Sequence, residues 1–379
     1  MSTSVDTARV LVADDQPDVR AALHLLMRDA GLETDSAGNV DEVRRKLEAG
    51  SYDLLLLDLN YARDTTSGHE GLALLAEVHA RDPLLPVVVM TGWGSVEMAV
   101  EAMRRGARSF VHKPWDNSAL SEAIRREVED GRAARRAERR ASREQEEAQA
   151  MQRALLPSSL PAVPGCDVAA RWTPALAFGG DCYDVVRLSE TRVALSIADV
   201  CGKGLAAALL MSNLQASVRA FATTDATPHR VAENVNGALV RNDGLRRFVT
   251  FFYAVYDTST REMTFANAGH NPPLLVGADG TVTRLSTGGM VLGVFDSTRF
   301  EQEKVRLSPG DRLVLFTDGI VEAGNARGDE FGDDRLADIV ARHRRAPASA
   351  LVDGIFEQVT RFTDGPLEDD ATVVVLAVQ

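Results

Sequence analysis

Aspartates stand directly after short apolar runs in the first third of this chain. Asp14 and Asp15 follow the run Val10–Ala13, and Asp58 ends the run Leu54–Asp58. Three carboxylates that converge on one crevice repel one another unless a cation lies among them, and an all-oxygen set of ligands suits Mg²⁺. The sequence therefore predicts a magnesium site formed by these three side chains.

The elements around these aspartates predict how they come together. Apolar strand candidates alternate with amphipathic helix candidates, at 10–13, 54–58, 87–90 and 109–111 for the strands and at 18–28, 40–49, 71–81 and 95–105 for the helices. Such alternation indicates a parallel sheet covered on both faces, with ligands bound beyond the carboxyl ends of the strands. Thr91 and Lys113 lie at two further strand ends. A simple helix-capping role for Asp14 and Asp15 would leave that coincidence unexplained.

This residue set resembles the receiver domain of bacterial two-component response regulators over nearly all of residues 8–118. The resemblance implies a doubly wound sheet of five parallel strands and a sensor histidine kinase as partner. One departure is a longer, proline-free loop before Gly71, where the family usually has Met-Pro. The implied roles are Asp58 as phosphoacceptor, Asp14, Asp15, Asp58 and the carbonyl of Asn60 as Mg²⁺ ligands, Thr91 as switch hydroxyl, Lys113 as phosphate-pairing ammonium, and Phe110 as aromatic rotamer switch.

A second set of aspartates occupies strand ends in the last two thirds of the chain. Its members each follow or open an apolar strand, and most of them neighbour a glycine: Asp181, Asp199, Asp318 and the pair Asp369–Asp370. Histidine and cysteine ligands are scarce, so Mg²⁺ or Mn²⁺ is favoured over Zn²⁺. Two such ions about 3.5–4 Å apart would activate a water and clamp a phosphoryl group for in-line attack.

The strand and helix pattern of this segment differs from that of the first. Seven strand candidates lie at 192–198, 249–256, 262–267, 273–276, 282–285, 312–317 and 372–378, and four helix candidates lie at 205–221, 229–240, 333–345 and 348–362. The dipeptide Asp279-Gly280 is a hairpin signal and favours antiparallel pairing. We expect an α+β layered fold with a β-sandwich core.

The motifs GGDCYD, ADVCGKG, NAGHNPP, FTDGIVEA and DDATVVVL resemble, in this order, the metal-dependent protein phosphatase superfamily (protein phosphatase 2C-like). The likeness is to its bacterial sporulation and stress-response branch and runs from about residue 150 to residue 379. The metal ligands that it implies are Asp181, Asp199, the carbonyl of Val200, Asp318 and Asp369, with Asp370 as the alternative because the register of the pair is open. Lys203 either meets phosphate or caps the helix 205–221.

The segment 119–156 lacks proline throughout and glycine after Gly131, and it is rich in Ala, Arg, Glu and Gln. It predicts a long helix between a receiver domain at 1–118 and a phosphatase domain at 157–379. A heptad seam counted from Leu120 is mostly alanine, which is typical of a weak coiled coil suited to switching. A homodimer or a phosphorylation-dependent dimer is therefore expected, with a solvated single helix as the alternative.

Composition limits the other functions. No apolar run approaches the ~18–20 residues of a membrane span, and the first residues lack the form of a secretory signal, so a cytoplasmic protein without membrane contact is expected. Three cysteines form no CxxC pair, so free thiols are expected. A net charge of −13 argues against nucleic-acid binding. An arginine-rich helix at 132–143 leaves a DNA-binding regulator as a testable alternative.

The sequence thus predicts a response regulator whose output hydrolyses phosphoserine or phosphothreonine through metal-activated water. The family resemblance implies a STAS-type anti-sigma-factor antagonist as the phosphorylated partner in a partner-switching pathway. A different class of protein, a catalytically silent phosphatase-fold adaptor that sequesters a partner, would be expected to have lost metal carboxylates. None of them is lost in this sequence.

Overall fold

The computed structural model describes residues 7–60, 69–92, 96–241, 247–363 and 365–379. The chain divides into two compact units, the first ending at Glu144 and the second beginning at Gln145. The proline-free loop expected before Gly71 falls mainly on residues 61–68, outside the described residues. So does Ser95, the first residue of the helix predicted at 95–105.

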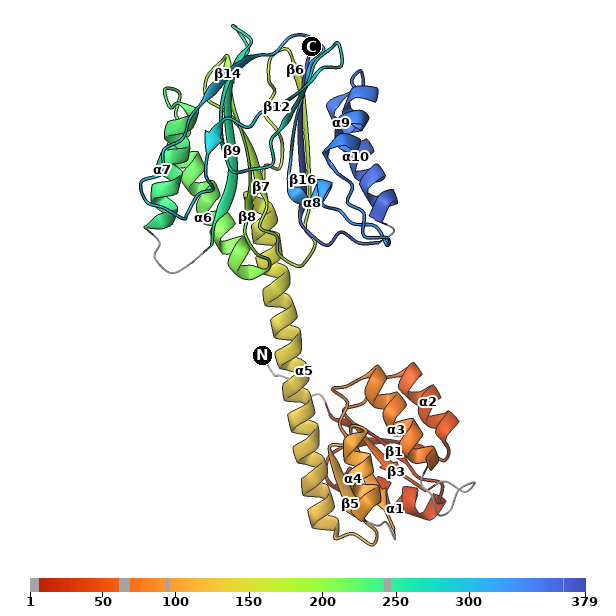
Figure 1. Ribbon diagram of the computed structural model, residues 1–379. Helices are drawn as coiled ribbons and strands as arrows, with labels where there is room; N and C mark the ends of the chain where they lie inside the picture. The colour runs from red at the N-terminus through yellow and green to blue at the C-terminus, as the bar shows by residue number, and fades with distance from the viewer. Residues whose placement is uncertain (1–6, 61–68, 93–95, 242–246, 364) are drawn as a thin grey trace. The chain divides into compact units, whose positions relative to one another are not determined.

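The first unit contains a five-stranded parallel sheet with the strand order β2-β1-β3-β4-β5. Helices α1 and α5 pack on one face of it and α2, α3 and α4 on the other (Figure 1). This is the predicted doubly wound receiver fold. The elements are β1 (Arg9–Ala13), α1 (Pro17–Asp29), β2 (Glu33–Ala37), α2 (Val40–Ala49), β3 (Leu54–Asp58), α3 (His69–Arg81), β4 (Val87–Thr91), α4 (Val96–Arg104), β5 (Ser109–His112) and α5 (Asn117–Leu155).

Helix α5 has 39 residues and begins as part of the first unit. Leu120, Ile124 and Val128 are buried against the sheet, at the four-residue spacing of one helix face. The coiled-coil seam predicted from Leu120 onward is therefore wrong at its start, because the apolar side chains there complete the receiver core. Residues 136–147 are all exposed, so this later part of the seam is free to pair.

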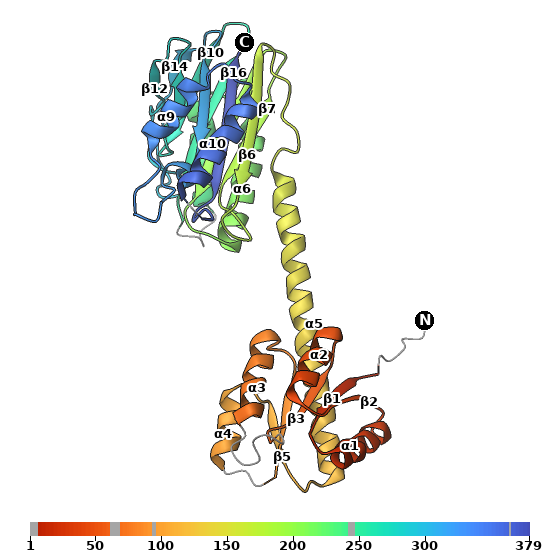
Figure 2. The ribbon, with the colours of Figure 1, turned by 90° about the vertical axis from the view of Figure 1, so that its right-hand side faces the viewer.

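The second unit stacks two sheets between two pairs of helices, which is the expected layered α+β fold with a β-sandwich core. One sheet has the order β13-β10-β9-β8-β7, with β14 paired to β10, and the other has the order β12-β11-β15-β16-β6. Helices α6 and α7 cover the first sheet, and α9 and α10 cover the second (Figures 1 and 2). The predicted hairpin at Asp279-Gly280 joins β11 to β12 in an antiparallel pair.

The elements of the second unit follow the chain in this order: β6 (Cys166–Thr173), β7 (Cys182–Arg187), β8 (Arg192–Val200), α6 (Leu205–Phe221), α7 (Pro228–Val240), β9 (Val249–Asp257), β10 (Glu262–Ala268), β11 (Leu274–Val276), β12 (Val282–Arg284), β13 (Gly288–Gly289), β14 (Glu303–Arg306), β15 (Arg312–Phe316), α8 (Asp318–Val321), α9 (Asp333–Arg342), α10 (Ala348–Thr363) and β16 (Ala371–Val378).

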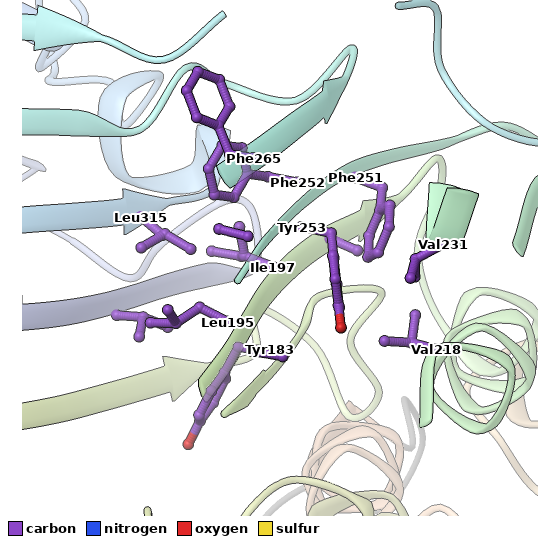
Figure 3. Close-up of a cluster of buried hydrophobic side chains, with 14 of the residues drawn as sticks. Tyr183, Leu195, Ile197, Val218, Val231, Phe251, Phe252, Tyr253, Phe265 and Leu315 are labelled. Carbon is purple, nitrogen blue, oxygen red and sulfur yellow. The ribbon is translucent and has the colours of Figure 1, made fainter. Parts of the chain in front are cut away.

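The core of this unit follows the two-residue period of its strands. Leu195 and Ile197 of β8 meet Leu315 of β15 between the sheets, whereas Tyr253 of β9 packs toward the helices beside Val218 of α6 (Figure 3). Because side chains alternate along β8, Asp199 continues the inward series of Leu195 and Ile197. The sandwich thus directs this carboxylate to the rim of its own core.

The fold bears on the expected free thiols and on the expected lack of a membrane span. Cys166, Cys182 and Cys201 are free thiols, as predicted. Within the described part of the chain, no helix has the length and apolar character needed to cross a membrane.

An ion pair between α5 and the sheet of the first unit predicts how the stability of this unit depends on pH. Arg132 donates two hydrogen bonds of 2.8 Å to the carboxylate of Asp53, which also accepts the amide of Arg9. Burial by itself raises the pKa of Asp53, but these hydrogen bonds outweigh it, so the pKa lies below the ordinary 3.8. A depressed carboxyl pKa stabilises the folded state above the unfolded pKa, and this stability is lost as the pH falls through the folded pKa.

Asp53→Asn should therefore lower the unfolding free energy of the first unit by about 1 kcal/mol at pH 7, and the difference from the parent should shrink as the pH falls below 3.8. Calorimetric unfolding of the full chain between pH 3 and 7 measures this. Asp41→Asn is the matched control, because the Asp41 side chain is 85% exposed. A pH-independent difference would contradict the ion-pair explanation.

Candidate active sites

The first site lies at the carboxyl edge of the parallel sheet. Asp14 follows β1 and Asp58 ends β3, and both are almost completely buried. One carboxylate oxygen from each of Asp14, Asp15 and Asp58 lies within 4.8 Å of the other two. The structure thus brings together the three carboxylates that the sequence singled out for magnesium.

Lys113 reaches this cluster from the end of β5. Its Nζ donates to Asp14 Oδ2 at 2.7 Å and to Asp58 Oδ2 at 2.9 Å. Burial raises the pKa of Asp58, and the charge of Asp14 adds to this, while Lys113 works in the opposite direction. The ammonium therefore offsets only part of the buried negative charge, and the three carboxylates fit a divalent cation with oxygen ligands.

The other predicted receiver residues differ in how they are placed. Thr91 ends β4, and its buried hydroxyl has no hydrogen-bond partner among the described residues. Asn60 donates its amide to Asp58 Oδ1 at 3.3 Å, so its backbone lies beside the acceptor. Phe110 lies on β5 with 52% of its surface exposed. An unpartnered buried hydroxyl beside the acceptor suits an incoming group rich in oxygen acceptors.

The second site gathers at one end of the sandwich. Asp181 precedes β7 and is 1% exposed. Its Oδ2 accepts hydrogen bonds from the hydroxyls of Thr317 at 2.7 Å and Thr372 at 2.6 Å. Its Oδ1 is buried and has no partner within the described chain. The two threonines therefore hold the carboxylate in one orientation and leave one oxygen for a ligand.

Burial and mutual repulsion disfavour the ionised form of the carboxyl groups in this site. Burial raises the pKa of Asp199 to about 7, and the charges of Asp318, Asp369 and Asp370 contribute. Burial and then the charge of Asp199 raise the pKa of Asp181 well above its usual range. Such a concentration of unpaired carboxyl groups is the electrostatic counterpart of a divalent-metal site.

Asp369 and Asp370 are adjacent in sequence but make different contacts. Asp370 is buried, and its two oxygens accept the amides of Ala175 at 2.9 Å and Gly180 at 2.5 Å. Asp369 is 47% exposed at its side chain and pairs with Lys203. Both oxygens of Asp370 are thus held by backbone amides of another loop. Among the described residues, Asp369 Oδ1 accepts only the adjacent amide of Asp370, at 2.8 Å, and its Oδ2 faces Lys203, so the more exposed Asp369 is favoured as the ligand of the pair.

Lys203 lies in the loop between β8 and α6. Its Nζ contacts Asp369 Oδ2 at 3.1 Å and donates to the carbonyl of Glu368. Of the two roles left open by the sequence, this contact with an acidic site residue favours the one that meets phosphate. The helix-capping role has no hydrogen bond to support it among the described residues, because no side chain caps the start of α6.

Two glycines allow the loops of this site to approach one another. A Cβ on Gly319 would lie 2.1 Å from the carbonyl oxygen of Asp370, and one on Gly180 would lie 2.8 Å from the carbonyl oxygen of Val200. The absence of side chains at these positions brings the loops of Asp318 and Asp181 against the other ligands. The carbonyl of Val200, predicted as a ligand, therefore lies beside the loop that carries Asp181.

Several residues of the site were not singled out from the sequence. Gln152 of α5 donates to the carbonyl of Gly179 at 2.6 Å and accepts its amide at 3.3 Å, two residues before Asp181. Thr317 and Thr372 adjoin the predicted aspartates in the motifs TDG and DDAT, which is a signal that could have found them. Gln152 gives no such signal, because it looks like any other polar residue of the long helix.

Chemically, the second site offers the oxygen ligands that hard divalent ions prefer. It has carboxylate and carbonyl oxygens and an unpartnered oxygen of Asp181, although among the described residues no three of its carboxylates lie within 4.8 Å of one another as those of the first site do. His270 is buried nearby, with Nδ1 bonded to Thr250 and Nε2 bonded to the carbonyl of Phe316, and burial lowers its pKa to about 4. A neutral histidine with both nitrogens engaged supports the backbone before Asp318 and leaves the chemistry to the carboxylates.

The chain matches two protein-family models. The model of stage II sporulation protein E (SpoIIE) matches residues 189–379, and that of the response regulator receiver domain matches residues 10–125. Together they show a receiver domain followed by a serine/threonine phosphatase domain of the protein phosphatase 2C type.

Three known proteins are similar to more than half of this chain. The phosphoserine phosphatase RsbU of Bacillus subtilis is 33% identical over 60% of this chain and 67% of its own length. Protein IcfG of Synechocystis is 27% identical over 59% of this chain and 40% of its own length. The solved RsbU and RsbW domains of Rv1364c from Mycobacterium tuberculosis have a TM-score of 0.53 and 30% identity, covering 59% of this chain and 62% of theirs. The chain thus spans only part of each of these relatives.

Removing a predicted ligand of the second site should abolish its chemistry without unfolding the protein. Asp181→Asn and Asp318→Asn should each lower the rate of phosphate-ester hydrolysis by at least 100-fold, because each removes charge from the metal cluster. Hydrolysis in Mn²⁺ and circular dichroism measure activity and fold. Activity equal to the parent in these variants would contradict the metal assignment.

Removing the predicted phosphoacceptor should affect only the first site. Asp58→Ala should abolish acid-labile labelling by a small phosphodonor, because Asp58 is the predicted phosphoacceptor, whereas Asp14 and Asp15 are predicted metal ligands. Hydrolysis of a small phosphate ester in Mn²⁺ should persist. Labelling that survives in this variant would place the acceptor elsewhere.

Proposed function

Because this chain belongs to the SpoIIE family and carries a receiver domain ahead of its phosphatase domain, we propose that it hydrolyses phosphoserine or phosphothreonine on a partner protein under control of receiver phosphorylation. The observation that carries this proposal is the buried carboxylate cluster with one free oxygen on Asp181. An adaptor that only sequestered a partner would not need so much buried negative charge at one point.

The residues of the second site divide the work of such a hydrolysis. Two Mg²⁺ or Mn²⁺ ions bound there would supply the Lewis acidity that activates water and polarises a phosphoryl group. Thr317 and Thr372 orient the carboxylate of Asp181 through its Oδ2. Lys203, now paired with Asp369, carries the ammonium that would meet a phosphate oxygen.

A protein substrate is supported by the surface beside this site. Helix α6 begins just after the loop of Val200 and Lys203, and two of its leucines one turn apart are strongly exposed. Leu205 is 54% and Leu209 is 62% exposed. Apolar side chains held in solvent next to a catalytic site suit contact with a folded partner. The identification of that partner as a STAS-type anti-sigma-factor antagonist rests on the likeness to the stress-response branch, which includes the phosphoserine phosphatases RsbU and RsbP of Bacillus subtilis.

Control by the receiver follows from the first site. A sensor histidine kinase would phosphorylate Asp58, with Mg²⁺ held by Asp14, Asp15 and the carbonyl of Asn60. The free hydroxyl of Thr91 would then donate to the phosphoryl group and bias the packing around it. Such couplings are usually worth about 1–3 kcal/mol.

Helix α5 is the physical connection for this signal. Its first turns are part of the receiver core, through Leu120 and Ile124, and its last turn contacts the phosphatase. There the side chain of Gln152 donates a hydrogen bond to the carbonyl of Gly179, and the side chain of Gln215 of α6 donates one to the carbonyl of Leu155. Between these ends, the exposed stretch 136–147 presents mainly alanine on its seam, so we propose that it forms a weak, phosphorylation-dependent homodimer.

One experiment separates the enzyme from the adaptor. The full chain should hydrolyse a small phosphate ester and a serine-phosphorylated STAS-type protein only with Mn²⁺ or Mg²⁺, and its rate should change when a small phosphodonor loads the receiver. Leu209→Glu should lower the catalytic efficiency on the phosphoprotein at least tenfold and leave the ester rate unchanged, because it alters only the docking surface.

The outcomes of this experiment are distinct. An absence of hydrolysis of both substrates with metal present would favour the silent adaptor and overturn the proposal. Ester hydrolysis without phosphoprotein hydrolysis would reject the STAS-type partner and keep the phosphatase. Gln302→Glu is a control for Leu209→Glu, because it places the same charge on an exposed position away from α6.

The linker proposal has its own test. Replacing Ala134, Ala141 and Ala148 with leucine should lock the dimer and make phosphatase activity independent of Asp58, because larger side chains bury more apolar area at the seam. Ala141→Pro should break the helix and uncouple the domains. Light scattering and activity are measured on the same samples. If both variants keep the parent's mass and its full response to phosphodonor, the helix is a passive tether.

A further inference from the structure

A basic cavity lies at the other end of the phosphatase sandwich from the metal cluster. Its volume is about 570 Å³, and Arg312, Arg344 and Arg345 line it together with Asp167 and the last residue, Gln379. Arg312 begins β15, whereas the catalytic Asp318 follows its last residue. At ~3.3 Å per residue the strand separates the two ends by about 13 Å. Figure 1 shows the C-terminus, whose last residue lines this cavity, at one end of the sandwich, and α8 lies farther along β16.

Arg312 is a buried guanidinium without a carboxylate partner. It is 8% exposed, and no ion pair within 4 Å is found for it in the described parts of the chain. Its Nη1 donates only to the carbonyls of Gly310 and Asp311, and its Nε has no hydrogen-bond partner. Buried charges in proteins are normally paired, so this unpaired guanidinium favours the binding of an anion.

The nearby carboxylates are already engaged by backbone amides. Asp167 accepts the amide of Ala348, the first residue of α10, at 2.7 Å. Asp311 accepts the amides of Ala278 and Ser308. Asp167 uses only Oδ2 for this bond, but neither carboxylate lies within ion-pair distance of Arg312 in the described parts of the chain. The guanidinium thus stays without a carboxylate partner in a cavity lined by three arginines.

We propose that this cavity binds a small phosphate-bearing molecule, with its phosphate held by Arg312, Arg344 and Arg345. The planar guanidinium fork matches the oxygens of a phosphate group, and three arginines in one lining favour an anionic ligand. The volume lies in the range of small-molecule sites and exceeds what a phosphate alone fills. Ala278, Ala346 and Pro347 supply an apolar wall for the remainder of the ligand.

Calorimetric titration of the full chain with inorganic pyrophosphate tests this site. EDTA is present to remove metal from both carboxylate clusters, so that pyrophosphate does not bind there through a metal ion. The parent should bind with a saturable one-site isotherm, and Arg344→Gln combined with Arg345→Gln should weaken binding at least tenfold. Arg342→Gln is the control, since it removes one arginine from the end of α9 outside the lining of this cavity, whereas the double variant removes two from the lining. It should bind within twofold of the parent.

Further arms make the outcome decisive. Arg312→Lys should also weaken binding at least tenfold, with ester hydrolysis in Mn²⁺ showing that the variant folds. Malonate, a dianion without phosphorus, should bind at least tenfold more weakly than pyrophosphate. The absence of saturable binding, an unchanged affinity in the Arg344 and Arg345 double variant, or an equal loss in Arg342→Gln would overturn the site. Equal affinity for malonate would overturn the assignment to phosphate.

Discussion

Repulsion between carboxylates held at strand ends is the constraint on which both units depend. Each fold buries aspartates that would be more stable apart, at Asp14 and Asp58 in the receiver and at Asp181 and Asp199 in the phosphatase. The receiver offsets part of this charge with Lys113, whereas the phosphatase offers no such buried cation among its described residues. The scaffold must therefore supply enough packing and hydrogen bonding to keep the clusters formed until cations neutralise them.

Much of this arrangement could be predicted from the sequence because strand ends carry a clear signal. An apolar run that stops at an aspartate fixes both the element and the edge of the sheet at which the side chain emerges, as at Asp58 and Asp199. Parallel topology then brings the carboxyl ends of neighbouring strands together, and in the sandwich the glycines beside Asp181 and Asp318 mark where loops converge. Chemistry and topology thus indicated the same residues independently.

The parts that could not be predicted lack periodicity or depend on distant contacts. Strand β2 reads ETDSA and lies at the sheet edge, so it has no apolar run to reveal it, and β6 is only half-buried along most of its length. The division of roles between Asp369 and Asp370 depends on amides almost 200 residues away in sequence. The assignment of Leu120 to a coiled coil failed because a helix face that completes a core and one that pairs with another helix follow nearly the same repeat.

The two threonines on Asp181 have a consequence for selectivity among divalent ions. Because Thr317 and Thr372 occupy Oδ2, this carboxylate can offer a metal only its other oxygen. Calcium commonly takes both oxygens of a carboxylate and accepts irregular coordination, whereas magnesium is held by single oxygens in a near-octahedral shell. Two hydroxyl groups outside the set of expected metal ligands would therefore help the site discriminate against calcium.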